Sequence, residues 1–67
     1  MTIQEIGKMV KFRREFLHLR QEDLYEMSGI TSRTIHLIES GTGNPSVVTL
    51  EKLALVLGME IIIQVKK

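Results

Sequence analysis

The stretch QEDLYEMSGITSRTIHLIESG, residues 21–41, decides the fold. Apolar residues that recur at helical spacing in both of its halves are expected to face inward, namely Leu24, Met27, Ile35 and Ile38. Gly29 is typical of the position just after a helix, because glycine readily adopts the left-handed conformation, and Thr31 is a favourable N-cap. The stretch therefore predicts two short helices, about 21–28 and about 32–40, joined by a tight turn.

The second of these helices carries a polar outer face. At about 100° per residue, Ile35 and Ile38 point inward, and the opposite side presents Arg33, His36, Leu37 and Ser40. Two short helices with a glycine-containing turn form the helix-turn-helix motif, whose second helix contacts base edges in the DNA major groove. The predicted base-reading residues are Thr31, Ser32, Arg33, His36 and Leu37, with Arg33 pairing bidentately with guanine. Every surface helix has a polar face, so geometry alone leaves both interpretations open.

Working outward, two more helices flank the motif and a strand follows them. Stripes of apolar residues after a threonine or serine N-cap predict helices over about residues 2–19 and about residues 46–57. The apolar period then changes to two, which predicts a β-strand over residues 59–66. The expected fold is mainly α, with a four-helix domain over residues 1–58 and a C-terminal strand within residues 59–67.

Composition excludes several classes of protein. The chain has 67 residues, a net charge of +1 and no cysteine, which rules out disulfides and thiolate metal sites. No apolar run reaches the roughly 18 residues of a membrane span and no signal-peptide pattern is present, so we expect a cytoplasmic protein without a membrane partner. His36 and Glu39 lack a third metal ligand nearby, and Ser32 with His36 lacks an orienting group. We therefore expect no enzyme, no metal, no cofactor and no small-molecule substrate.

Several segments resemble the Cro/CI-type (XRE) helix-turn-helix family. They are QEDL at 21–24, GIT at 29–31, TI at 34–35, IESG at 38–41, NPS at 44–46 and TL at 49–50. The resemblance implies a lambda-repressor-like fold and an ion pair between Arg14 and Glu39. The sequence agrees with that pair, because both charges interrupt apolar stripes and an unpaired buried charge is costly. Tyr25 stands where the family has a small alanine, so either its ring points outward or the two motif helices lie further apart.

The predicted phosphate contacts surround the second motif helix. The resemblance implies that Gln21, at the start of the first motif helix, binds a DNA phosphate. We expect further phosphate contacts from Arg20, Ser40 and Asn44. Arg20 also replaces the serine or threonine that the family has before Gln21, so the first motif helix is expected to lose its cap.

The C-terminal strand predicts how the protein assembles. A lone strand with an apolar face is an aggregation hazard, and antiparallel pairing with a second copy removes it. The predicted dimer contacts come from Met59, Ile61, Ile62, Ile63 and Val65. The two paired strands would form a ribbon, and the apolar stripe that this ribbon could cover is Met9, Phe12 and Phe16. A strand after four helices is also similar to the HipB-like antitoxins, whose two copies pair this strand and whose partner is a HipA-type kinase toxin.

The expected function is a sequence-specific DNA-binding transcriptional repressor that binds double-stranded operator DNA as a homodimer. The HipB-like resemblance implies the antitoxin of a HipBA-type toxin–antitoxin module that represses its own operon. A stand-alone phage-type or housekeeping repressor is the alternative within this class. A protein-interaction module is the alternative from another class, and the low net charge favours it.

Overall fold

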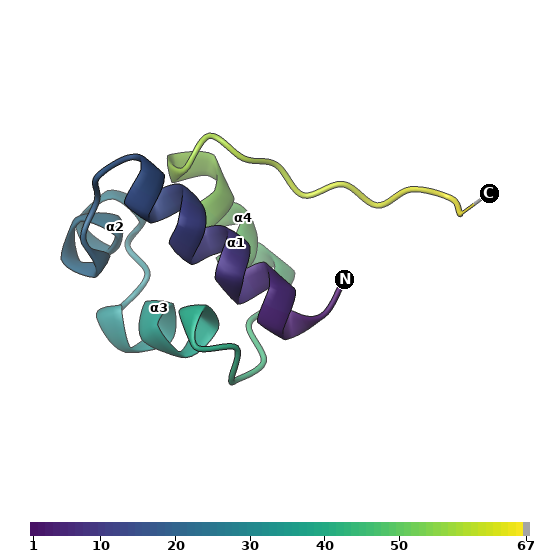
Figure 1. Ribbon diagram of the computed structural model, residues 1–67, viewed down its shortest axis with the longest axis horizontal. Helices are drawn as coiled ribbons and strands as arrows, with labels where there is room; N and C mark the ends of the chain where they lie inside the picture. Colours follow the sequence, from purple (N-terminus) through teal and green to yellow (C-terminus); the bar gives the residue numbers. More distant parts are fainter. Residues whose placement is uncertain (67) are drawn as a thin grey trace.

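The helices of the computed structural model, which describes residues 1–66, follow the predicted order (Figure 1). Within the described residues they are α1 (Ile3–Phe16), α2 (Gln21–Ser28), α3 (Ser32–Glu39) and α4 (Val47–Val56). Helix α1 packs against α3, and α2 packs against both α3 and α4. The prediction of a mainly α, four-helix chain is confirmed.

The core lies where the helical stripes converge. Its fully buried side chains are Leu24, Ile35, Ile38, Leu53 and Leu57. The inward orientation predicted for Met27 is wrong, because the buried stripe of α2 runs through Gln21, Leu24 and Ser28, and Met27 lies to one side of it in solvent. Each helix of this small domain therefore contributes one narrow stripe to the core.

Helix α1 has a strong start and an earlier end than predicted. The hydroxyl of Thr2 accepts from the backbone N–H of Glu5 at 3.1 Å, and the Glu5 carboxylate accepts from the backbone N–H of Thr2 at 3.0 Å. The helix ends at Phe16 rather than near Leu19, because His18 adopts a left-handed conformation with φ of 59°. The chain therefore turns towards α2 three residues before the predicted end.

Helices α1 and α3 approach most closely at Gly7. A methyl group on the Gly7 Cα would overlap the carbonyl oxygen of Ile38. Glycine is required here for lack of space rather than for backbone conformation, and this close approach sets the position of α3 on α1.

The C-terminal segment leaves the helical body as an extended chain (Figure 1). The backbone N–H of Met59 donates to the carbonyl of Ala54 at 2.8 Å, and Met59 packs against the core. The predicted strand is not formed in residues 59–66, because a strand requires hydrogen bonds to a neighbouring strand and the described chain contains none. Pairing with a second copy stays a prediction, and residue 67 lies outside the described residues.

Candidate nucleic-acid interface

Helix α3 has one buried and one exposed face. Thr31 caps it, its hydroxyl accepting from the backbone N–H of Thr34 at 3.3 Å. Ile35 and Ile38 are buried against α1 and α2, and the opposite side exposes Ser32, Arg33 and His36. The structure thus brings three of the predicted base-reading side chains, together with the exposed Thr31 at the helix start, to one surface.

Leu37 is half-buried rather than fully exposed as the helical wheel predicted. The loop after α3 folds back over it, and Leu37 lines a small hollow with Thr42, Gly43 and Pro45. The carbonyl oxygen of Leu37 accepts from the backbone N–H of Thr42 at 3.0 Å and from the hydroxyls of Ser40 at 3.0 Å and Thr42 at 3.3 Å. These bonds end α3 and fix the loop.

Two predicted phosphate ligands lie at this end of α3. Ser40 is exposed, but its hydroxyl donates to the Leu37 carbonyl and lies 3.0 Å from the Thr42 hydroxyl. Asn44 is exposed in the loop between α3 and α4. Of the two, the structure leaves Asn44 the freer to meet a ligand.

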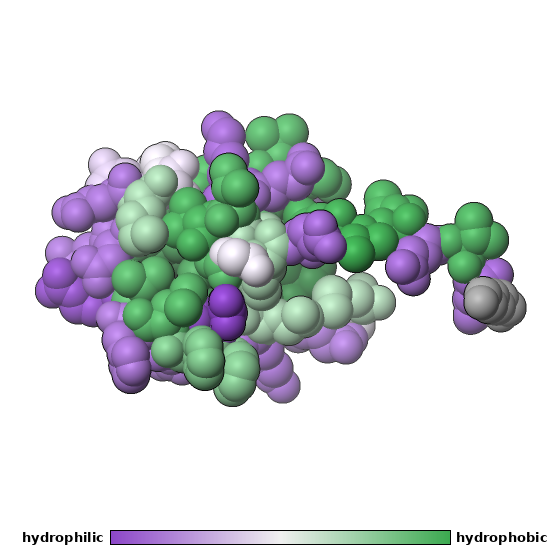
Figure 2. Space-filling view, turned by 90° about the horizontal axis from the view of Figure 1, so that it is seen from above, coloured by the Kyte–Doolittle hydropathy of each residue, from purple (hydrophilic) through white to green (hydrophobic). Residues whose placement is uncertain are grey.

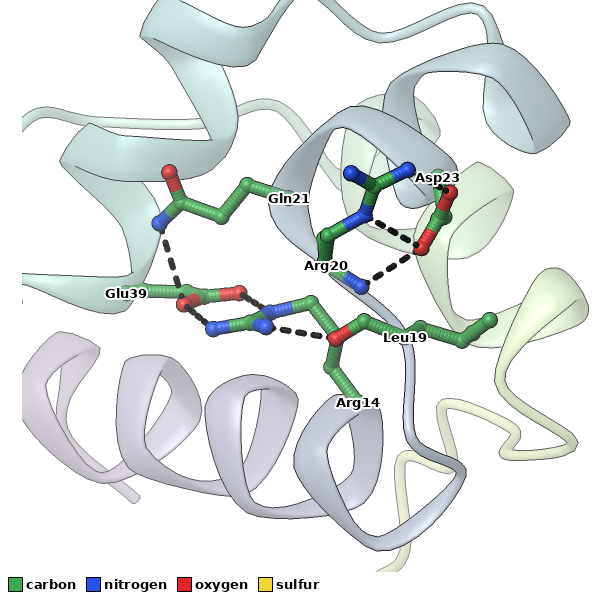
Figure 3. Close-up of polar contacts among 6 residues, drawn as sticks. All are labelled: Arg14, Leu19, Arg20, Gln21, Asp23 and Glu39. Atoms are coloured by element: carbon green, nitrogen blue, oxygen red, sulfur yellow. Dashed lines mark hydrogen bonds and ion pairs between the residues drawn. The ribbon is translucent and has the colours of Figure 1, made fainter.

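A polar cluster joins α1, α2 and α3 (Figure 3). The guanidinium of Arg14 donates through Nε to Glu39 Oε2 at 2.7 Å and through Nη2 to Glu39 Oε1 at 2.9 Å. Its Nη1 donates to the backbone carbonyl of Leu19 at 2.7 Å. Both side chains are almost fully buried, and the hydrogen bonds to Glu39 raise the pKa of Arg14 against the effect of burial. The structure thus brings the two predicted partners together in a bidentate ion pair.

Gln21 is part of the same cluster. Its side-chain N–H donates to Glu39 Oε1 at 3.2 Å, so the predicted phosphate ligand also ties α2 to α3 (Figure 3). The amide group carries two N–H donors, and the second is free to reach a phosphate from the half-buried side chain.

Arg20 precedes α2 and is bound to acidic neighbours. Asp23 accepts from the backbone N–H of Arg20 at 2.8 Å and from its guanidinium at 3.3 Å, and Glu22 lies 3.6 Å away. These bonds lower the pKa of Asp23, first through the backbone N–H and then through the side chain of Arg20. The expected loss of the cap is therefore only partial, because Asp23 satisfies the backbone N–H of the N-cap residue.

Lys11 was not among the phosphate contacts predicted from the sequence. This exposed lysine lines a polar hollow together with Gln21, His36 and Ser40, which α1, α2 and α3 bring together. Its spacing could have indicated this position, because Lys11 lies three residues before Arg14 and so on the same side of α1. Arg13, also on α1, is structural, because its Nε donates to the carbonyl of Leu57 at 2.8 Å.

Two other features bear on the kind of protein. No helix of the described residues is long and apolar enough to cross a membrane. Residues 1–66 also contain no group of three or more His, Asp or Glu side chains that could hold a metal ion.

The arrangement of α2 and α3 defines the class of protein, a helix-turn-helix domain of the kind found in DNA-binding transcriptional regulators. The helix-turn-helix family profile matches residues 10–63, and the chain belongs to this family, of the Cro/CI (XRE) type. The chain is also 37% identical over 52 residues to an uncharacterized HTH-type transcriptional regulator of Methanothermobacter thermautotrophicus (strain Delta H), covering 78% of this chain and 75% of that protein.

Proposed function

We propose that the protein is a sequence-specific transcriptional repressor that binds double-stranded operator DNA as a homodimer. The observation that carries this proposal is the division of α3 into two faces. Ile35 and Ile38 fix the helix on the body, while Arg33 and His36 project from it. A rigidly held helix with free polar side chains in its first turns is what major-groove reading requires.

Arg33 is the principal base-reading residue in this proposal. Its guanidinium can donate two parallel hydrogen bonds to O6 and N7 of guanine. Thr31, Ser32 and His36 supply secondary contacts from the same exposed side, and Leu37 offers its accessible part to a thymine methyl group.

Phosphate contacts position the helix. The polar hollow that contains Lys11 and Gln21 borders the C-terminal half of α3 through His36 and Ser40, and Asn44 lies in the loop that follows the same end of the helix. Donors gathered at this end of α3 can bind backbone phosphates beside the major groove and so fix the register of the helix on the DNA. Arg20 and Ser40 complete the proposed set, although both already make internal hydrogen bonds.

The experiment compares Arg33→Ala with the wild type on a selected operator and on random duplex DNA. Arg33→Ala is expected to weaken binding to the operator by about 1–3 kcal/mol and to relax preference at one base position. Gln21→Ala and Asn44→Ala are expected to weaken binding to both DNAs evenly and to reduce the salt slope. Lys52→Ala, which removes one charge from an exposed position on α4, is the control.

Two results would contradict the proposal. An equal loss on operator and random DNA for Arg33→Ala would exclude base reading by Arg33. A wild-type protein whose affinity for duplex DNA does not fall with added salt would exclude DNA binding through phosphates altogether and would favour the protein-interaction module.

A second proposal concerns the biological setting, an antitoxin that represses the operon of its own toxin. It is supported by an apolar surface on α1 that offers a docking face to a partner protein. Met9, Phe12 and Phe16 are exposed along one side of the helix, and the Arg13 guanidinium lies 5.2 Å from the centre of the Phe16 ring. Figure 2 shows apolar side chains gathered on the face seen from above and along the tail.

The antitoxin proposal is tested with the neighbouring reading frame. A HipA-type kinase encoded beside this chain is expected to copurify with it, and Phe12→Ser with Phe16→Ser is expected to break the complex without changing DNA binding. Retention of the complex by that double variant would remove the α1 surface from the proposal, leaving a stand-alone repressor as the simpler assignment.

A further inference from the structure

The C-terminal tail becomes less covered as it leaves the helical body. Its odd-numbered apolar side chains form a series in which Met59 is half-buried, Ile61 is 43% exposed, Ile63 is 93% exposed and Val65 is 94% exposed. In an extended chain these alternate residues lie on one face. The body therefore covers the start of this face and leaves the rest of it in water.

The covered end of the tail borders an open groove. This groove has a volume of about 300 Å³ and lies between α1 and α4, where Ile6, Met9 and Leu50 line it together with residues 59–62 of the tail. Its lining is mostly apolar, and its open side admits additional side chains. An apolar groove beside an unfinished apolar strand suits a second apolar strand.

We propose that the two tails of the homodimer pair antiparallel with Ile63 opposite the partner's Ile63, an inference that rests on the homodimer proposed above. Residues directly opposite one another in an antiparallel pair lie on the same face of the ribbon. The two odd-numbered faces therefore coincide only when the numbers of the paired residues add to an even sum. This condition leaves registers in which one residue lies opposite its own copy in the partner, such as residue 62, 63 or 64.

Charge complementarity selects the register centred on Ile63. In this register alone, Glu60 lies opposite the partner's Lys66, and Lys66 lies opposite the partner's Glu60. Both side chains are exposed, and both lie on the even-numbered face of the extended tail. Opposite charges placed directly across a strand pair stabilise it, so each dimer gains two such pairs.

The same register completes the groove. Ile61, which lines the groove, then lies opposite the partner's Val65, within the side-chain contact distance of a cross-strand pair. Each groove is thus covered first by its own Met59 and Ile61 and then by the partner's Val65. The exposed apolar face of the tail is buried only when a second chain is present.

Cysteine cross-linking tests the register cleanly, because the chain contains no cysteine. Ile62→Cys, Ile63→Cys and Gln64→Cys are made singly, and the covalent dimer is quantified after mild oxidation on a non-reducing gel. Opposed Cα atoms lie about 4.5–5.5 Å apart, within disulfide range, whereas diagonal neighbours are too distant. We expect rapid cross-linking of Ile63→Cys alone, and of Ile62→Cys mixed with a size-tagged Gln64→Cys.

Faster self-cross-linking of Ile62→Cys or Gln64→Cys would overturn this register in favour of its neighbours. Absence of preferential cross-linking at all three positions would overturn tail pairing. Sedimentation and DNA binding of the wild type show whether only the pairing of the tails is wrong or the proposed function is wrong as well. If the wild type is a dimer that binds operator DNA, the proposed function stands. If it is a monomer that does not bind DNA, the proposed function is excluded.

A charge swap tests the pairing of Glu60 with the partner's Lys66. Glu60→Lys and Lys66→Glu are each expected to raise the dimer dissociation constant about 3- to 10-fold, and the double variant is expected to restore it. Glu26→Lys, on α2 at the end of the molecule opposite the tail (Figure 1), makes the same change of charge and should leave dimerisation unchanged. Failure of the double variant to restore dimerisation would exclude the pair.

Discussion

Two regions differ in whether one chain supplies all of their contacts. They are the polar cluster that joins α1, α2 and α3, called the polar junction below, and the apolar C-terminal tail. At the junction, Arg14 donates to Glu39 and to the Leu19 carbonyl, and among the described residues no buried side-chain nitrogen or oxygen lacks a partner. In the tail, Ile63 and Val65 are almost fully in water. The polar junction is therefore complete within one chain, whereas the tail leaves apolar side chains uncovered, and it is there that we propose a second chain binds.

The largest expected effect comes from breaking the junction. Arg14→Met or Glu39→Leu is expected to lower the free energy of unfolding by about 3–5 kcal/mol, because each leaves the other charge buried without its partner. Urea unfolding followed by circular dichroism measures the loss. The double variant Arg14→Met with Glu39→Leu should be milder than either single change, and small, equal effects of both single changes would show that the pair is open to solvent.

A smaller loss is expected from Gly7→Ala. The added methyl group meets the carbonyl oxygen of Ile38, and the backbone of α3 must move to admit it. We expect about 3 kcal/mol of destabilisation, typical of overpacking in a tight core. Lys8→Ala, at the next and exposed position of α1, should change stability by less than about 0.5 kcal/mol. Similar values for the two variants would contradict the close packing of α1 on α3.

Removing the tail should affect assembly and leave the body nearly unchanged. A chain that ends at Met59 keeps the Met59 hydrogen bond to Ala54 and the packing of Met59 on the core. At concentrations where the protein is monomeric, its unfolding free energy should match that of the full chain within about 0.5 kcal/mol. Sedimentation at micromolar concentration should show a monomer for the truncated chain and a dimer for the full chain. A dimer of the truncated chain would refute the role given to the tail.

The smallest effect concerns the exposed cap of α2. The hydrogen bonds from Arg20 lower the pKa of Asp23 below its ordinary value of 3.8. A depressed pKa means that this carboxylate stabilises the fold above its unfolded pKa and loses that contribution as the pH falls through its folded pKa. Asp23→Asn should therefore flatten the decline in unfolding midpoint below about pH 4. Equal flattening by Glu26→Gln, on the same helix, would attribute the effect to overall charge instead.

Helical periodicity predicted the body well because its signals are local and repeated. Leu24, Ile35 and Ile38 were placed correctly from their spacing, and the N-cap of α3 follows from Thr31. Met27 has similar local spacing and is exposed, because which flank of a short helix is buried depends on its neighbours. The end of α1 was misplaced because His18 is a non-glycine residue in the left-handed conformation, which no residue pattern indicates.

The candidate site was predictable in outline and incomplete in detail. The exposed position of Arg33 and His36 followed from the helical wheel. The bond from Gln21 to Glu39 depends on where α2 meets α3, which spacing along one helix does not determine. The described residues offer the tail no neighbouring strand, so its alternating pattern can form a strand only through the pairing with a second copy that is proposed above.

The contacts that hold helix α3 in place do not involve the side chains proposed to read bases, Ser32, Arg33 and His36. Its start is fixed by Thr31, its end by the Leu37 carbonyl, and its inner face by Ile35, Ile38 and Glu39. Within the described chain, none of the side-chain hydrogen bonds comes from Ser32, Arg33 or His36. These three positions can therefore vary at little cost to folding. With the base-reading role proposed above, the domain is open to being retargeted to new DNA sequences, by natural variation or by a library randomised at these positions alone.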